Sequence, residues 1–280
     1  MTLLKATILL GTATYANTVF PFDWPAAFSM LIVCLEYASL PKSSPIAANC
    51  AGCSVRDVSL CGALLDDELA ALNGIGRRHK LGRGDTMMWA GEASRHCGNL
   101  LSGVLKLSAA LPDGREQIVG LLYPSDFIGR PFAEAIEFSV SALTPSEVCM
   151  FPREPFEQIL QDHPKMERLL LQRTLSSLTE ARYRILMMGR ASAREKVLAF
   201  LVDTALRARS RCPGTPPNAL KFELPLTRGE IAALLGLTIE TVSRQLADLR
   251  SSGLVKLEGA RSVIVDDLAL LTAQLDHKPA

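Results

Sequence analysis

The stretch that most constrains this chain is residues 226–249, which read LTRGEIAALLGLTIETVSRQLADL. Thr227 can accept a hydrogen bond at a helix start, and Glu230, three positions later, can complete a capping box. Gly236 then ends the first predicted helix with a residue that tolerates positive φ. After the turn, Thr238 can cap a second helix. Two short helices joined by a glycine-containing turn predict a helix-turn-helix.

The second predicted helix has two faces of opposite character. Apolar residues at steps of three, four and three predict one buried face, made of Ile239, Val242, Leu246 and Leu249. On the other face, Glu240, Ser243 and Arg244 lie at i, i+3 and i+4, so they can enter one major groove together. Arg can donate hydrogen bonds to guanine O6 and N7, Glu can accept one from a cytosine amino group, and Ser can donate or accept. The alternative is a plain αα-hairpin with a solvated charged face.

The sequence after this unit predicts a wing. Residues 253–265 (GLVKLEGARSVIV) indicate two short strands that turn at 258–261. Between residues 190 and 265 there are 12 Lys and Arg against 7 Asp and Glu, although the whole chain has a net charge of only +1. A local positive excess of this kind suits a domain that contacts phosphates.

Cysteines form the second informative pattern. The chain has seven of them, and Cys50, Cys53 and Cys61 follow a C-x2-C-x7-C spacing. Thiolates are soft ligands that favour zinc or iron–sulfur centres. A fourth ligand is needed, and the candidates are Cys149, Cys97, Cys34 and Cys212. Spacing alone selects neither the fourth ligand nor the metal.

The region between these two features predicts a β-roll. Residues 77–151 alternate short apolar runs with turn signals, which is typical of an antiparallel barrel or roll. The turn signals stand at 82–85, 91, 103, 112–114 and 124–126. Just before this region, residues 64–72 (LLDDELAAL) predict a short amphipathic helix.

A long helix is predicted at residues 164–188, with Pro164 at its first turn. One face carries a seam at alternating steps of three and four, made of Leu171, Thr174, Leu178, Ala181, Ile185 and Met188. Such a seam is typical of two helices pairing and predicts a homodimer. The alternative is a helix that lies on the roll of its own chain. Residues 189–192 then suggest a hinge, and 211–217 an irregular loop.

Residues 1–49 are expected to be an N-terminal extension. Two apolar runs, 6–16 and 26–35, are shorter than the roughly 18 apolar residues of a membrane span, so no membrane association is expected. Met30 is an alternative start site.

Several of these motifs together resemble one protein family. Residues 227–231 (TRGEI) and 235–244 (LGLTIETVSR) resemble the DNA-binding domain of the Crp/Fnr superfamily of bacterial regulators. The C-x2-C-x7-C pattern, together with Cys149 followed by Met-Phe-Pro-x-x-x-Phe, is similar to FNR-branch members of the FnrN/FnrL type. The resemblance implies a [4Fe-4S] cluster held by Cys50, Cys53, Cys61 and Cys149. The remaining cysteines are expected to be packing residues or free thiols.

The resemblance also implies a fold and a function. The expected fold class is α+β, with an N-terminal cyclic-nucleotide-binding-type β-roll, a long dimerisation helix and a C-terminal winged helix-turn-helix. The expected domains are the extension 1–49, cysteine loop plus β-roll sensor 50–163, dimerisation helix 164–189, DNA-binding domain 190–268 with its helix-turn-helix at 228–247, and tail 269–280. The expected DNA contacts are Glu240, Ser243, Arg244, Thr238, Thr241 and Arg228.

The implied function is a cytoplasmic, sequence-specific regulator that senses oxygen through the cluster. As a homodimer it would bind double-stranded DNA at TTGAT-N4-ATCAA-like palindromes, contact RNA polymerase, and activate or repress anaerobic and microaerobic genes. The alternative is a Crp-like regulator that is gated by a small molecule and whose cysteines bind structural zinc.

Two other classes of function are not expected. Nucleotide-binding members carry Gly-Glu-Leu and a downstream Arg-Ser or Arg-Thr, whereas this chain has IGRPF at 128–132 and EFSVS at 137–141. Only Arg130 remains to meet a phosphate, so a cyclic nucleotide is not expected as ligand. An enzyme is not expected either, because the chain has no phosphate-binding glycine loop, no second cysteine set and no nucleophile–base constellation.

Overall fold

The computed structural model describes residues 50–276 except 51, 67 and 212–219. The predicted extension and most of the predicted loop at 211–217 therefore lie outside the described residues, as do the last four residues. No helix in the described part of the chain is long and apolar enough to cross a membrane.

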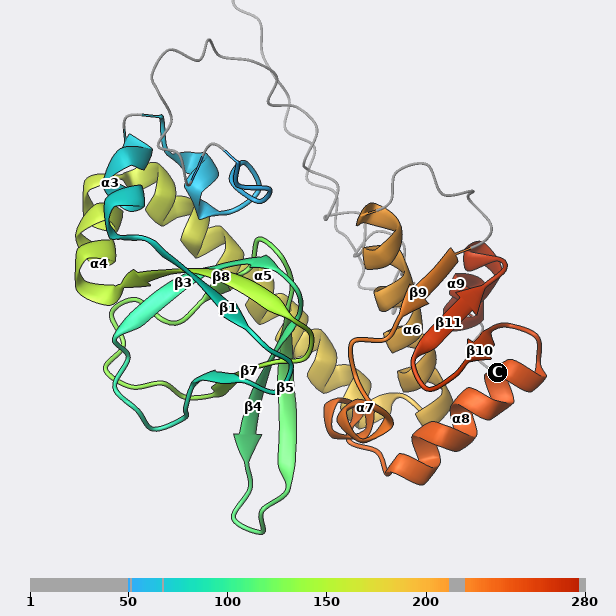
Figure 1. The fold of residues 1–280 in the computed structure, drawn as a ribbon. Helices are drawn as coiled ribbons and strands as arrows, with labels where there is room; N and C mark the ends of the chain where they lie inside the picture. Colours follow the sequence, from blue (N-terminus) through green and yellow to red (C-terminus); the bar gives the residue numbers. More distant parts are fainter. Residues whose placement is uncertain (1–49, 51, 67, 212–219, 277–280) are drawn as a thin grey trace, which may run out of the picture. The chain divides into compact units, whose positions relative to one another are not determined.

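Eight strands form the predicted roll (Figure 1). They are β1 Arg77–Leu81, β2 Thr86–Met88, β3 His96–Ser102, β4 Leu105–Ala110, β5 Glu116–Leu122, β6 Phe127–Ile128, β7 Ser139–Ala142 and β8 Ser146–Pro152. They pair antiparallel in two four-stranded sheets, ordered β1-β8-β3-β6 and β2-β7-β4-β5. Apolar side chains of both sheets form a common core that includes Leu100, Leu105, Ile128, Val140 and Val148. The roll prediction is confirmed.

The predicted turn signals fall between strands, as expected. Gly103, between β3 and β4, has a φ of 89°. A Cβ atom there would lie 2.1 Å from Ser146 Oγ, so only glycine fits this turn.

Short helices cover the end of the roll where the cysteine loop lies. They are the 3-10 helix η2 Leu60–Ala63 and the α-helices α3 Glu68–Ile75 and α4 Arg153–Asp162. The helix predicted at 64–72 begins later, at Glu68, because Leu64 is extended and the Glu68 carboxylate accepts from the Leu65 amide at 2.7 Å. Helix α4, whose Phe156 and Leu160 are buried, is not predicted from the sequence.

The predicted long helix is α5 Pro164–Arg190, two residues longer than expected, with Pro in its first turn. It ends at Ala191, which is extended, and α6 Ala193–Arg211 follows. Ser192 and Glu195 form reciprocal hydrogen bonds between their side chains and backbone amides at the start of α6. The predicted hinge therefore coincides with a break between two helices.

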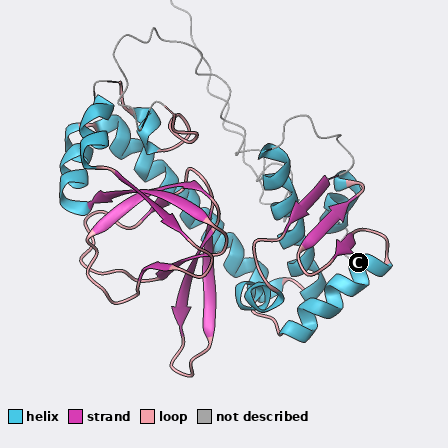
Figure 2. Cartoon of the chain, in the orientation of Figure 1, coloured by secondary structure: helices cyan, strands magenta, loops and turns pink. Residues whose placement is uncertain are grey.

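The C-terminal module is a winged helix-turn-helix. Its elements after α6 are β9 Leu220–Glu223, α7 Arg228–Leu235, α8 Ile239–Ser251, β10 Lys256–Glu258, β11 Ser262–Val265 and α9 Leu268–Asp276. The two predicted wing strands are β10 and β11, and β9 adds a third strand in the order β10-β11-β9. Figure 2 shows these helices beside the three-stranded sheet, and their buried apolar side chains form one cluster together with roll residues such as Ile118 and Leu143.

The C-terminal segment differs from its prediction as a tail. Residues Leu268–Asp276 form α9, and Leu268 and Leu271 are buried in the core of this module. Apolar residues at helical spacing explain this packing.

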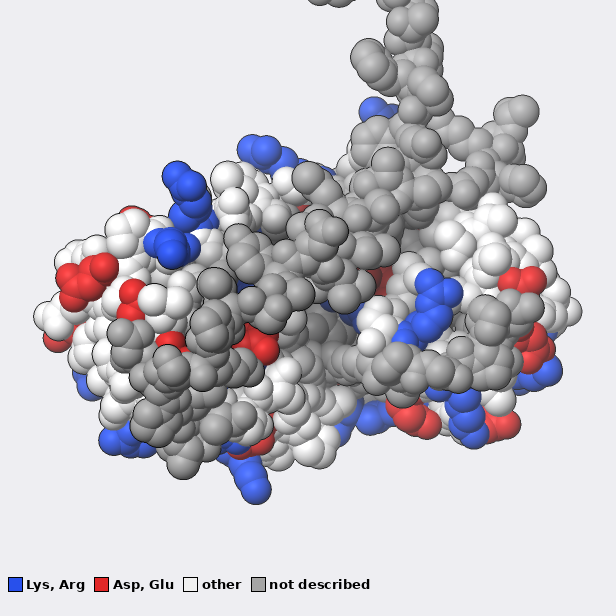
Figure 3. All heavy atoms as spheres, turned by 90° about the horizontal axis from the view of Figure 1, so that it is seen from above, with Lys and Arg blue, Asp and Glu red and all other residues white. Residues whose placement is uncertain are grey.

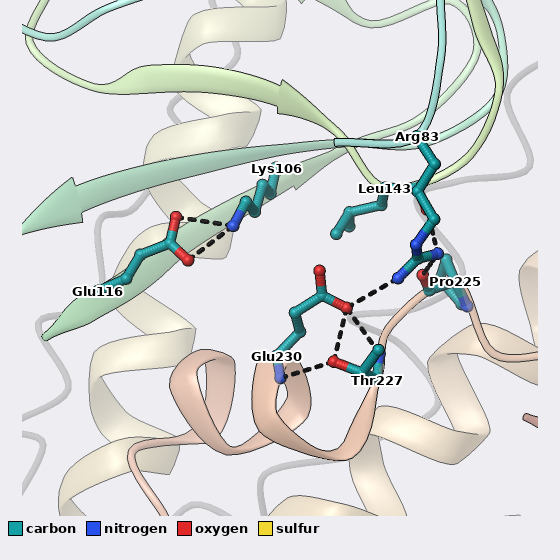
Figure 4. Close-up of polar contacts among 7 residues, drawn as sticks. All are labelled: Arg83, Lys106, Glu116, Leu143, Pro225, Thr227 and Glu230. Atoms are coloured by element: carbon teal, nitrogen blue, oxygen red, sulfur yellow. Dashed lines mark hydrogen bonds and ion pairs between the residues drawn. The ribbon is translucent and has the colours of Figure 1, made fainter. Parts of the chain in front are cut away.

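An arginine of the β1–β2 loop bonds residues at the start of α7. Arg83 pairs with the Glu230 carboxylate at 3.0 Å and donates to the Pro225 carbonyl at 3.2 Å (Figure 4). It also donates to the Leu143 carbonyl. The same Glu230 carboxylate accepts from the Thr227 amide at 2.7 Å, so it completes the predicted capping box while it binds Arg83.

Candidate metal centre and nucleic-acid interface

Four cysteines line one pocket beside the roll: Cys50, Cys53, Cys61 and Cys149. The first three come from the segment that ends in η2, and the fourth comes from β8. The structure therefore brings together the four cysteines that the family resemblance implies as ligands.

Local turns shape the loop that carries the first three thiols. The Cys53 amide donates to the Cys50 carbonyl at 3.2 Å, and the Ser59 side chain caps η2 by accepting from the Cys61 amide at 3.4 Å. A Cβ atom on Gly62 would lie 2.6 Å from the Asp57 carbonyl oxygen. Gly62 therefore lets the chain fold back directly after Cys61.

Cys149 occupies a central position in its sheet, because β8 lies between β1 and β3. Its direct neighbours across the sheet are Arg78 on β1 and Asn99 on β3. Residues directly opposite each other share one face of a sheet, so these two side chains flank Cys149 on its own face. A Cβ atom on Gly76 would lie 3.3 Å from Cys149 Sγ, so glycine leaves room beside the sulfur.

Burial favours the protonated form of three of the four thiols, those of Cys50, Cys61 and Cys149. Burial, followed by the charges of the other three thiols, raises the pKa of Cys149 to about 12, against the opposing charge of Arg78. Burial likewise raises the pKa of Cys61 to about 11, against an opposing hydrogen bond from Ser59. The pKa of Cys50 is raised by burial and then by the charge of Cys53. Four thiolates could share this pocket only with a compensating positive charge, which a metal centre supplies.

Four thiols form a donor set that a cluster can use. Among the described residues, no group of three or more His, Cys, Asp or Glu side chains converges closely enough to hold a metal ion. The thiols instead surround a mostly apolar pocket that Leu72, Leu101 and Phe151 help to line. A [4Fe-4S] cluster takes one thiolate per iron, so four thiols around a pocket suit its ligation.

Cys97, another candidate ligand, does not line this pocket. Cys97 is buried among Phe151 and Phe156, and its thiol faces the Phe151 carbonyl at 4.0 Å. Burial raises the pKa of Cys97 to about 12, with Glu157 rather than another cysteine as the next cause. Cys97 therefore packs as a small apolar residue. Cys34 and Cys212 lie outside the described residues.

The predicted recognition helix is formed as the sequence indicates. Thr227 caps α7, Gly236 ends it with a φ of 61°, and Thr238 caps α8 by accepting from the Thr241 amide at 3.2 Å. Thr238 and Thr241 also share a hydroxyl–hydroxyl hydrogen bond of 3.1 Å.

Three of the predicted DNA contacts lie exposed on one face of α8: Glu240, Ser243 and Arg244. The backbone amide of Glu240 and the Thr238 side chain lower the pKa of the Glu240 carboxyl, so this group is ionised at neutral pH. Val242, Leu246 and Leu249 are buried on the other face. Ile239 differs from its prediction because 51% of it is exposed, as it stands in the first turn beside the cap.

Arg228, the remaining predicted contact, is the first residue of α7. Its Nη1 atom is buried without a hydrogen-bond partner among the described residues, and burial lowers the pKa of its guanidinium. On the face that Figure 3 shows, basic and acidic side chains are interspersed, in keeping with the small net charge.

A second pocket lies in the roll, where Gly129, Arg130 and Glu137 help to line it. Arg130, the side chain that could meet a phosphate, forms an ion pair with Glu137. The Glu137 carboxylate would repel a phosphate at the same place.

The predicted seam of α5 is exposed along its length. All six of its residues have exposed side chains, namely Leu171, Thr174, Leu178, Ala181, Ile185 and Met188. The helix binds its own chain through other residues, because Arg173 donates to the Ser125 carbonyl at 3.0 Å and Arg184 donates to the Val119 carbonyl. The seam therefore does not lie on the roll of its own chain.

Together, an antiparallel roll, a long helix with an exposed seam and a winged helix-turn-helix define a two-module transcription regulator. Residues 78–163 match the cyclic nucleotide-binding domain family, and residues 195–274 match the Crp-like helix-turn-helix domain family. The chain belongs to the Crp/Fnr family of transcriptional regulators. It is therefore a regulator and not an enzyme, as the sequence predicts.

Individual relatives support this membership. The chain is 39% identical over 233 residues to the transcriptional activator protein FnrL of Cereibacter sphaeroides, an alignment that covers 83% of this chain and 94% of FnrL. It is 35% identical over 208 residues to the nitrogen fixation regulation protein FixK of Bradyrhizobium diazoefficiens, with 74% and 86% covered. Among solved structures, FixK2 from Bradyrhizobium japonicum superposes with a TM-score of 0.64 at 26% identity, covering 74% of this chain and 100% of FixK2.

Proposed function

We propose that this protein is an oxygen-responsive transcription regulator that binds DNA as a homodimer when it holds a [4Fe-4S] cluster. The observation that carries the proposal is the meeting of Cys50, Cys53, Cys61 and Cys149 around one pocket, although the fourth thiol comes from a distant strand. These four residues would hold the cluster. Bound there, the cluster would supply an iron–sulfur centre that oxygen oxidises.

The chain offers a physical route from the cysteine loop to α5. Arg173 of α5 donates to the Val58 carbonyl, which lies between Cys53 and Cys61, and also to the Ser125 carbonyl of the roll. The Arg173 guanidinium therefore bonds the loop and the roll at once. When the four thiols are held together, the loop keeps the Val58 carbonyl in place, and Arg173 orients α5. When the thiols separate, this constraint on α5 is lost.

A constrained α5 would pair with its copy through the exposed seam. Leu171, Leu178 and Ile185 are apolar side chains that a second copy would cover. A twofold pair would place two copies of α8 about one DNA turn, ~34 Å, apart, so the operator would be palindromic. We propose TTGAT-N4-ATCAA-like sites.

Each predicted contact has a role in this complex. Arg244 would bind a guanine edge, Glu240 a cytosine amino group, and Ser243 an adjacent base. Thr238 and Thr241 at the start of α8 and Arg228 at the start of α7 would contact phosphates. To switch an operator from nearly full to nearly empty, the cluster must favour the binding state by about 5 kcal/mol.

The remaining proposals concern the cell. We place the protein in the cytoplasm, where it would contact RNA polymerase and activate or repress genes of anaerobic and microaerobic growth. We also propose the domain limits given above, except that α9 belongs to the DNA-binding domain, and that no cyclic nucleotide binds, because Glu137 already pairs with Arg130.

DNA binding with and without air tests the proposal. Anaerobically purified full-length protein should bind a fluorescent TTGAT-N4-ATCAA duplex, and brief exposure to air should weaken binding by at least a hundredfold. Arg244→Ala should abolish the preference over a scrambled duplex, while Arg250→Ala, an exposed change at the far end of α8, should retain it. Equal affinity with and without air would refute oxygen control.

A second candidate is a regulator gated by a small molecule, with zinc on the four thiols. The roll pocket favours it, because side chains such as Met88, Leu107 and Phe138 give that pocket apolar walls. Iron and sulfide analysis of anaerobic protein distinguishes the two, since the zinc alternative predicts a colourless protein without either element.

A further inference from the structure

One buried amide faces the cysteine pocket. Asn99 on β3 is only 1% exposed, and it is the sole carboxamide among the buried polar side chains of the described residues. It lines the same pocket as the four thiols and stands directly opposite Cys149 in the β3–β8 register. A buried amide is costly unless its polar atoms have partners, so its position calls for an explanation.

The hydrogen bonds of Asn99 point to that explanation. Its Nδ2 atom donates to Cys61 Sγ at 3.5 Å, which is a normal length for a bond to sulfur. Its Oδ1 atom has no hydrogen-bond partner among the described residues. A leucine of similar size would avoid this unsatisfied acceptor, so the structural benefit of the amide is small. The donor, by contrast, is aimed at a sulfur.

We propose that Asn99 is a positioning residue that tunes the metal centre through an N–H···S bond to Cys61. This inference rests on the proposed function, since it takes the pocket as the site of a [4Fe-4S] cluster. Asn99 and Cys61 come from different segments, so the bond also holds the cysteine loop to the sheet that carries Cys149.

The direction of the effect follows from electrostatics. A donor next to a thiolate sulfur withdraws electron density and stabilises the more negatively charged, reduced state of a cluster. Asn99 should therefore make the centre harder to oxidise and slow its loss in air. Because the amide does not titrate, this effect should be the same across neutral pH.

Isosteric replacements test the proposal. Asn99→Leu keeps the volume and removes the donor, and Asn99→Asp keeps the shape but presents a carboxylate. Ser141→Ala is the matched control, because it removes a buried side-chain hydrogen bond, to Thr86 at 2.9 Å, from the other sheet of the roll. The measurements on full-length anaerobic protein are iron and sulfide content, the reduction potential of the cluster, and the decay rate of visible absorbance in air.

We expect all variants to assemble the cluster. Asn99→Leu should lower the reduction potential by about 59 mV, which is a tenfold change in a one-electron equilibrium. Its cluster should decay several-fold faster in air, and Asn99→Asp should shift both quantities further in the same direction. Ser141→Ala should match wild type.

Two outcomes would overturn the inference. One is a potential and decay rate in Asn99→Leu equal to wild type. The other is loss of iron from both Asn99 variants, which would assign the amide a purely structural role. If wild type itself holds no iron or sulfide, the proposed function fails instead, so the two failures are distinguishable.

Discussion

Replacing Ile185 in the seam of α5 should weaken the dimer without disturbing the fold of one chain. Ile185 is 70% exposed, so it contributes little to the stability of the isolated subunit. In a twofold pair the same side chain lies at the interface in both copies. Ile185→Ala therefore removes apolar area twice from the dimer.

The expected loss of dimer stability follows from the exposed fraction of the Ile185 side chain. Complete burial of an isoleucine side chain stabilises by about 1.5–3 kcal/mol, so covering the exposed 70% is worth about 1–2 kcal/mol per subunit. Alanine retains roughly a third of this, which leaves a loss of about 1.5–3 kcal/mol per dimer. Because about 1.4 kcal/mol corresponds to tenfold in affinity, the Kd for dimerisation should rise about 10- to 100-fold.

Sedimentation velocity over a range of protein concentrations measures this Kd on anaerobic protein. Leu186→Ala is the matched control, since Leu186 is 53% exposed but lies outside the seam at the next position. It should leave the Kd within a factor of two of wild type. If both variants weaken the dimer equally, or if neither does, α5 does not pair through the predicted seam.

Four further changes test individual parts of the account. Thr227→Ala should lower the free energy of unfolding by about 1 kcal/mol in urea denaturation, because it removes the cap of α7, and Thr227→Ser should restore most of it. Leu271→Ala should cost about 2–5 kcal/mol in the same assay, because Leu271 of α9 is fully buried; a cost near zero would mean that this segment is a dispensable tail. Arg173→Met should leave the iron content unchanged. The factor by which air raises the dimerisation Kd should be at most half of that in wild type, and an unchanged factor would exclude the proposed coupling through Val58. Burial raises the pKa of Cys97 from 9.0 to about 12, so its contribution to stability is fully present below pH 9 and is lost as pH rises toward 12. The free energy of unfolding should accordingly fall less between pH 8 and pH 11 in Cys97→Ala than in wild type.

Local signals in the sequence predict most of the fold. The capping box of Thr227 and Glu230 and the glycine after α7 depend only on neighbouring residues, and the structure forms both. Turn signals also depend only on neighbouring residues, and the predicted ones fall between strands of the roll. The exposed Ile239 was mispredicted, because helical periodicity identifies a face but not whether another element covers its first turn.

Local signals in the sequence likewise predict only part of the candidate site. The spacing of Cys50, Cys53 and Cys61 indicates a thiol centre. The fourth ligand could be identified only from the family resemblance, because the strand order of the folded sheet is what brings Cys149 close to the other three. Asn99 and Arg78 were not predicted as neighbours of this site. One signal in the sequence could have indicated Asn99. It is a polar amide in a largely apolar strand, where Leu100 and Leu101 follow it on β3. The register that sets it opposite Cys149 is a non-local property.

The most direct test of the central claim is iron and acid-labile sulfide analysis, with a visible spectrum, of anaerobically purified protein. Wild type and Cys97→Ala should each hold about four iron and four sulfide per subunit, whereas Cys149→Ala should hold far less. A colourless wild type, or a cluster that survives in Cys149→Ala and disappears in Cys97→Ala, would contradict the claim that Cys50, Cys53, Cys61 and Cys149 form the sensing centre.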